Sequence, residues 1–82
     1  MEQFETGMMA RSKSGHDAGK VYVITKVEEA YVYLVDGKIR TLDKPKKKKK
    51  KHVQIILKQY ETAGADDGKI RQILKTWNQK EG

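Results

Sequence analysis

VYVITKVEEAYVYLV, residues 21–35, is the stretch of this 82-residue chain that decides its fold. Residues 21–27 and 31–35 are rich in Val, Ile and Tyr, whose branched or aromatic side chains fit a pleated sheet, so both segments predict strands. Glu28-Glu29-Ala30 lies between them and predicts a turn. The stretch therefore predicts an antiparallel hairpin.

The residues on either side extend this hairpin into a meander. We expect a short first strand over residues 7–11, followed by a loop over 12–19 whose glycines and small polar residues favour turns. Asp36-Gly37 is typical of a two-residue hairpin turn, which predicts a returning strand over 38–42. Such a meander predicts a small β-barrel.

The segment 52–57 fits two structures. Its apolar residues alternate as in a strand, but several of them also recur at helical spacing. We favour a strand, because a meander needs further strands to cover its edges.

The last element is predicted to be a helix. Apolar residues recur at i, i+3, i+4 and i+7, namely Ile70, Ile73, Leu74 and Trp77. We expect the helix over about residues 67–79, with Asp66 or Asp67 capping its N-terminus. A short helix is marginal alone, so its apolar stripe must dock, either on the barrel or on a partner. The expected organisation is a barrel domain over 1–58, then a connector and helix over 59–82.

The net charge of +7 is concentrated in one run. Residues 44–51 carry seven lysines and no acid, whereas the remaining 11 Lys and Arg balance 11 Asp and Glu. We interpret this run, which is interrupted by Pro45, as a lysine-rich loop. A focused cationic patch favours a polyanion partner, RNA or DNA. Because Lys is a flexible point charge, the run would bind backbone phosphates without reading bases.

Composition bears on the setting and on the chemistry. The chain has no cysteine, which excludes disulfides and thiolate metal sites and favours a reducing compartment. No apolar run is long enough to cross a bilayer, and the first residues lack a secretory signal, so we expect a cytoplasmic protein. His16 and His52 are too few for a metal site, and no catalytic motif is present. We therefore expect a non-enzyme without cofactors.

The order of these features resembles the KOW motif. A strand, a glycine-punctuated polar loop, Gly19-Lys20 and an alternating strand follow one another over residues 7–24, and the lysine-rich segment with His52 comes after. The chain thus resembles eukaryotic- and archaeal-type large-subunit ribosomal proteins with a KOW barrel, over about residues 5–57. The resemblance implies an SH3-like barrel of about five strands and RNA binding, with Gly19 at the position of the family's near-invariant glycine.

This resemblance and the charge pattern together define a candidate site. The expected protein is a monomer that binds structured RNA, ribosomal RNA foremost, through phosphates. The residues expected to contact RNA are Arg11, Lys13, His16, Lys20, Lys44, Lys46, Lys47, Lys48, Lys49, Lys50, Lys51 and His52. The residues expected to shape the loop are Gly15, Asp17 and Gly19, with Asp17 bonding to nearby amides.

Other readings stay open at this point. The barrel could serve as an interaction module of a transcription or translation complex, touching nucleic acid nonspecifically. Electrostatic membrane binding is disfavoured, since no apolar anchor or lipidation signal accompanies the lysines. Pro45 and the lysines after it also resemble a nuclear-import signal. Tyr22, Tyr31 and Tyr33 would stack bases where they face outward and would pack the core where they face inward.

Overall fold

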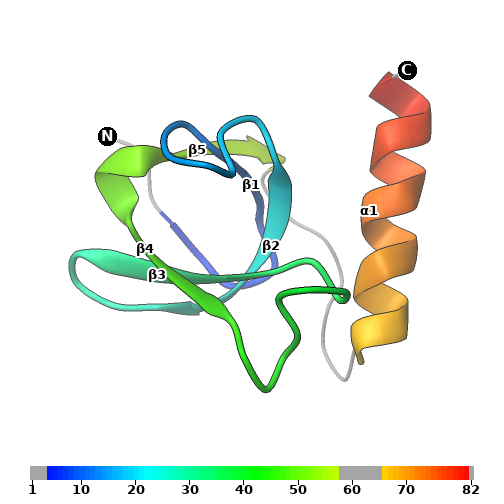
Figure 1. Ribbon diagram of the computed structural model, residues 1–82, viewed down its shortest axis with the longest axis horizontal. Coiled ribbons are helices and arrows are strands. Elements are labelled where there is room, and N and C mark those ends of the chain that lie inside the picture. The colour runs from blue at the N-terminus through cyan, green and yellow to red at the C-terminus, as the bar shows by residue number, and fades with distance from the viewer. Residues whose placement is uncertain (1–3, 58–65, 82) are drawn as a thin grey trace.

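The computed structural model describes residues 4–57 and 66–81, which form a five-stranded antiparallel sheet followed by one helix (Figure 1). The connector expected after residue 58 lies mostly outside the described residues. The strands and helices run in the order β1 Met9–Ser12, β2 Val21–Val27, β3 Tyr31–Val35, β4 Lys46–Lys49, the 3-10 turn η1 Lys50–His52, β5 Val53–Leu57 and α1 Asp67–Glu81.

The predicted hairpin is confirmed. β2 and β3 have the bounds expected from the sequence, and they pair antiparallel with Val27 opposite Val32 and Val23 opposite Val35. The turn at 28–30 is closed by the Glu28 amide, which donates to the Tyr31 carbonyl at 2.8 Å. The first strand is displaced from the predicted 7–11 to Met9–Ser12, and the ambiguous segment 52–57 is a strand from Val53 onward.

The strand predicted over 38–42 is wrong, because Asp36 folds this segment onto itself. Its Oδ1 accepts hydrogen bonds from the backbone amides of Lys38 and Arg40, both at 2.9 Å. The Arg40 carbonyl accepts from the amides of Asp36 and Gly37. These local bonds occupy the groups that a ladder would need, so residues 36–45 form a loop instead of a strand.

The loop predicted over the lysine run is also wrong. Lys46–Lys49 is β4, which pairs antiparallel with β3, with Tyr31 opposite Lys49 and Leu34 opposite Lys46. The pairing uses backbone groups, which lysine supplies as well as any other residue except proline. The alternation of a strand then sends successive lysines to opposite faces.

The strand order is β4-β3-β2-β1-β5, so β4 and β5 are the two edges of the sheet. No β4–β5 ladder joins these edges among the described residues, and the expected closed barrel is not formed. Instead, η1 connects the two edges directly, with the Lys50 amide bonded to the Ala30 carbonyl at 3.0 Å.

Both faces of the sheet carry apolar clusters. The first cluster fills the concave side and contains Met8, Ala10, Tyr22, Ile24, Val32, Leu34 and Val53. The second lies between the sheet and the helix and contains Met9, Val23, Val35, Ile70, Ile73 and Leu74. The helix therefore docks on the sheet, alongside which it lies in Figure 1. The expected cap is confirmed, since Asp66 Oδ1 accepts from the Lys69 amide at 2.8 Å.

Candidate nucleic-acid interface

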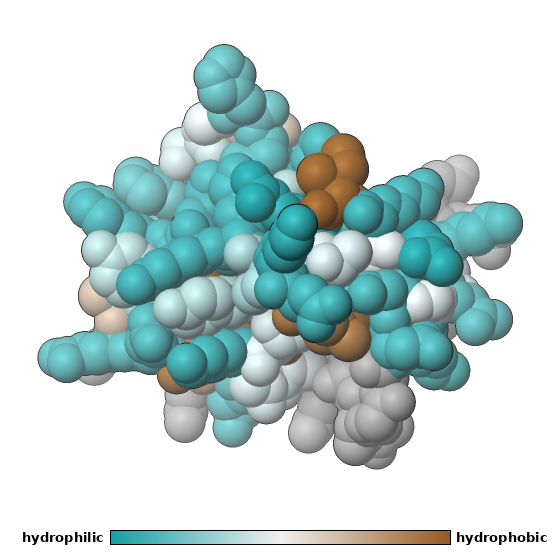
Figure 2. Space-filling view, turned by 60° about the horizontal axis from the view of Figure 1, so that its bottom comes forward, coloured by the Kyte–Doolittle hydropathy of each residue, from teal (hydrophilic) through white to brown (hydrophobic). Residues whose placement is uncertain are grey.

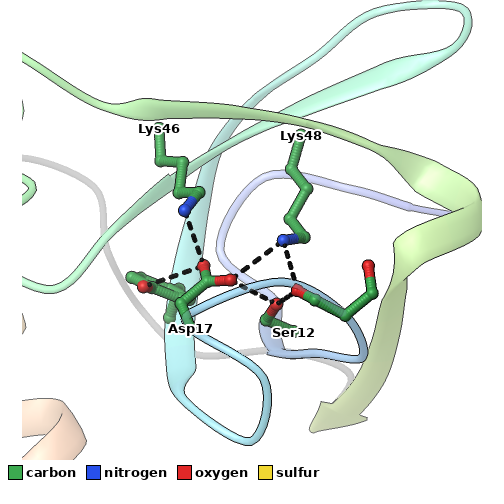
Figure 3. Close-up of polar contacts among 6 residues, drawn as sticks. Ser12, Asp17, Lys46 and Lys48 are labelled. Carbon is green, nitrogen blue, oxygen red and sulfur yellow. Dashed lines mark hydrogen bonds and ion pairs between the residues drawn. The ribbon is translucent and has the colours of Figure 1, made fainter.

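A buried carboxylate links β4, the lysine strand, to the loop at residues 12–19, called the glycine loop below (Figure 3). Asp17 Oδ2 lies 3.0 Å from the Nζ of Lys46, and Asp17 Oδ1 accepts from the Nζ of Lys48 at 3.0 Å. Lys48 also donates to the Ser14 carbonyl at 2.9 Å. The edge strand β4 is thus tied by side chains to the loop that follows β1.

Two hydroxyl groups complete the surroundings of Asp17. Ser12 Oγ lies 2.9 Å from Asp17 Oδ1 and 3.1 Å from the Ser14 carbonyl, so its single proton is shared between these acceptors. The Tyr22 hydroxyl donates to Asp17 Oδ2 at 3.2 Å. The expectation that Asp17 bonds to nearby amides is therefore wrong for its side chain: the partners are ammonium and hydroxyl groups.

This environment changes the acidity of both ends of the network. Burial by itself would raise the pKa of Asp17, but the hydrogen bonds from Lys46, Lys48 and Ser12 outweigh it and hold the pKa well below its usual range. Burial, reinforced by the charge of Asp17, raises the pKa of Tyr22 to about 12. Asp17 is therefore a carboxylate at neutral pH, and Tyr22 keeps its proton.

The glycine loop turns at two residues whose backbone has a positive φ, a conformation that favours glycine. Gly15 and Gly19 have φ values of +86° and +91°. The Gly19 amide donates to the Ser12 carbonyl at 2.8 Å, which folds the loop back onto the end of β1. A Cβ on Gly19 would meet no atom within 4 Å, so the requirement for glycine comes from the backbone angle and not from crowding.

The opposite face of β4 presents lysines to solvent. Lys47 Nζ lies 4.5 Å from the ring centroid of Tyr31 and 3.8 Å from the carboxylate of Glu28, while about half of its side chain stays exposed. Lys49 and Lys51 are exposed and have no acidic partner among the described residues. Lys50 is half-buried, with its Nζ 5.7 Å from the Phe4 ring.

The predicted site residues therefore differ in their exposure and in their contacts. Lys46 and Lys48 are 26% and 11% exposed and serve the internal ion pairs. Lys13, His16, Lys20, Lys44, Lys49 and Lys51 are exposed. The backbone of Lys13 is bonded to the end of η1, because its amide donates to the His52 carbonyl at 2.8 Å. Arg11 and His52 are half-buried.

No model of a known protein family and no curated protein matches this chain.

The tyrosines considered for base stacking also divide. Tyr22 is 3% exposed and engaged with Asp17, so it is a core residue. Tyr31 and Tyr33 are half-buried on the outer face, where the Tyr33 hydroxyl donates to Glu28 Oε1 at 3.2 Å. Lys26 and Lys47 lie over the Tyr33 ring, at 5.3 and 5.9 Å from its centroid. The sequence did not predict that Lys26 and Lys47 lie over Tyr33, because Lys26 stands alone in a strand and belongs to no motif or charge run.

Two further classes of site were sought among the described residues. No group of three or more His, Asp or Glu side chains there could hold a metal ion. No helix in the described part of the chain is long and apolar enough to cross a membrane.

Proposed function

We propose that this chain is an RNA-binding module, ribosome-associated or similar to a ribosomal protein, that holds structured RNA through backbone phosphates. One observation carries the proposal. β4 and η1 hold a row of lysines at the edge of the sheet, and Lys49 and Lys51 are exposed without an acidic partner among the described residues. Cations held in this way meet phosphates with less loss of backbone freedom than a disordered tail.

The adjoining loop supports the same function. Lys13 and His16 are exposed in the glycine loop, which hydrogen bonds bring next to η1 and β4. These bonds bring together two parts of the predicted site that lie far apart in sequence. The outward tyrosines Tyr31 and Tyr33 adjoin it through Lys47 and supply partly exposed rings beside the cations.

The proposed fold family is the SH3-like KOW type, in an open form whose sheet is not closed into a barrel. Five strands in this order, with β4 and β5 joined by a single 3-10 turn, support it. The positive φ of Gly19 supports it as well, because the resemblance assigns a near-invariant glycine to that position. In this proposal the Asp17 ion pairs hold β4 against the loop in place of a closing ladder. The proposed setting is the cytoplasm.

A side-by-side titration tests the proposal. Binding of the purified protein to structured RNA, duplex DNA and anionic vesicles is measured by fluorescence anisotropy or co-sedimentation across a series of salt concentrations. We expect RNA to bind most tightly, with log K falling against log salt by about 0.7–0.9 for each phosphate contacted. Preference for vesicles, or RNA binding that salt does not weaken, would contradict the proposal.

The ribosomal part of the proposal has its own test. Tagged protein in a cell lysate is sedimented through a sucrose gradient, with and without RNase and a high-salt wash. We expect co-migration with large ribosomal subunits that RNase or salt abolishes. Migration as a free small protein in every condition would leave RNA binding to be explained by another RNA and would exclude stable ribosome association.

A further inference from the structure

A groove runs between α1 and the loop at 36–40, away from the lysine strand. Its volume is about 1160 Å³, and residues 19–21 form its far end. The helix contributes Arg71, Gln72, Leu74 and Lys75, and the loop contributes Asp36, Lys38 and Ile39. Of these lining residues, Gly19 and Lys20 belong to the site predicted from sequence.

The two walls of the groove are fastened to each other. Arg71 Nη1 donates to the Gly37 carbonyl at 2.6 Å, and the Leu42 amide donates to Asp67 Oδ1 at 2.8 Å. Gly37 has a φ of +79°, and a Cβ there would collide with the Asp67 carbonyl oxygen. The loop therefore lies directly against the helix, and the groove is formed before any ligand arrives.

The rim of the groove is cationic. Lys20, Lys38, Arg71 and Lys75 line it, and Asp36 is the one acid that the described residues contribute to the lining. Asp36 Oδ1 already accepts two backbone hydrogen bonds. None of the three lysine ammonium groups pairs with an acid within the described ranges. An anionic ligand would thus meet several uncompensated charges.

The floor of the groove is aliphatic. Val21 and Leu74 line it, and Ile39 is 74% exposed at its edge. Ile39 is the most exposed of the large hydrophobic side chains in the described residues. Figure 2, which brings the 36–45 loop towards the viewer, shows a mostly hydrophilic face interrupted by a few apolar residues. Among the described residues no aromatic ring lines the groove, so these residues offer bases no stacking surface there.

We propose that this groove binds an acidic peptide segment of a partner protein, with an aliphatic side chain against Ile39 and carboxylates on the cationic rim. Aliphatic contact surrounded by opposite charges matches a peptide of Leu or Ile among Glu and Asp better than it matches a nucleic acid. A second copy of this chain is disfavoured as the occupant, because each copy carries a net charge of +7. The groove would give the RNA-binding module a separate means of joining a protein complex.

The test uses the full chain and a defined probe. A fluorescein-labelled peptide with one central leucine flanked by glutamates is titrated by anisotropy, and amide shifts of the isotope-labelled protein are followed by NMR. Control peptides carry serine in place of leucine, or lysine in place of glutamate. We expect the leucine peptide to bind with shifts confined to residues 19–21, 36–40 and the exposed side of 71–75, and both controls to bind at least several-fold more weakly.

Matched variants separate the groove from general charge. Ile39→Ser keeps every charge and should weaken peptide binding by about tenfold, since it removes one aliphatic contact. Lys75→Ser should weaken it by about two- to fivefold, whereas Lys51→Ser removes the same charge elsewhere and should change it less than twofold. Affinity of Ile39→Ser for structured RNA should equal that of the unmodified protein.

Several results would overturn the proposal. No binding of the leucine peptide, or equal binding by Ile39→Ser, would remove the aliphatic contact on which it rests. Equal losses in Lys75→Ser and Lys51→Ser would mean that the peptide responds to net charge alone. RNA or anionic vesicles that shift the same amides and displace the peptide would assign the groove to those ligands instead.

Discussion

Replacing Asp17 with asparagine removes the charge that holds the lysine strand to the glycine loop. The substitution keeps the shape of the side chain and one acceptor oxygen. It leaves Lys46 and Lys48, which are 26% and 11% exposed, facing a neutral group. The Tyr22 and Ser12 hydroxyls lose an ionic acceptor at the same time. The variant therefore tests whether β4 depends on this network.

The expected loss follows from the burial of the groups. Removing one partner of a buried ion pair costs about 3–5 kcal/mol when the remaining charge stays in place. Lys48 keeps its bond to the Ser14 carbonyl, and the flexible stem of Lys46 can turn toward water, so we expect about 2–4 kcal/mol. A domain of this length has a total stability of about 4–12 kcal/mol. The melting temperature should fall by about 10–30 °C.

Urea denaturation followed by the fluorescence of Trp77, the one tryptophan, measures this loss. Trp77 packs against the cluster between sheet and helix, so its emission reports unfolding of the domain. As a control, Lys46→Met and Lys48→Met combined with Asp17→Asn should recover part of the stability, because no unpaired charge remains. If Asp17→Asn stays within about 0.5 kcal/mol of the unmodified protein, a value typical of surface substitutions, the structural role of the network is refuted.

Three further predictions concern the same framework. Because the pKa of Asp17 is lowered in the folded state, the stability that its carboxylate contributes is present above the ordinary carboxyl range and is lost as pH falls below about 4. Urea titrations at several pH values should therefore show a steeper loss of stability in acid for the unmodified protein than for Asp17→Asn. Parallel pH profiles of the two proteins would contradict this. Gly37→Ala should cost about 2–4 kcal/mol, because the new Cβ would lie 2.8 Å from Arg71 Cγ and strike the Asp67 carbonyl at a positive φ. Gly19→Ala has the same kind of backbone angle but open space around it, so it should cost only about 1–2 kcal/mol, and equal losses in the two variants by urea denaturation would disprove this distinction.

Local pattern was enough for the elements whose side chains alternate. Residues 21–27 and 31–35 combine β-branched and aromatic side chains with a polar turn, and the structure forms both strands at those bounds. The helix was equally readable, because its apolar spacing reflects one buried face. In each case the element is stabilised by burying one face, and this requires apolar residues at a regular spacing in the sequence.

The lysine strand could not be read in this way. A run of identical residues has no periodicity, and lysine has little preference for strands. The strand forms because β3 offers an unpaired edge and because Asp17, about thirty residues earlier, binds alternate lysines. The wrong prediction of a strand over 38–42 has a local cause. The pair Asp36-Gly37 is typical of a two-residue hairpin turn, but it also begins a loop in which the Asp36 side chain accepts backbone hydrogen bonds.

The sequence therefore predicted where the candidate site lies, but not which of its lysines stabilise the fold and which face solvent. Charge counting found the lysine run, and loop composition with the resemblance to the KOW motif found the glycine loop that lies beside it. Neither could separate Lys46 and Lys48, which hold the fold, from Lys49 and Lys51, which face solvent. Within β4 that division depends on which face of the strand each side chain occupies, and Lys51 lies beyond the strand, in η1.

One paired measurement can separate the roles of these two pairs of lysines. Lys49→Ser/Lys51→Ser and Lys46→Ser/Lys48→Ser lose the same charge, and both are titrated with structured RNA over a range of salt, at a temperature where circular dichroism reports folded protein. The account predicts that the first variant keeps its stability while its salt slope drops by about 1.4–1.8. It predicts that the second keeps the slope but loses stability. Equal losses of slope and of stability in the two variants would contradict it.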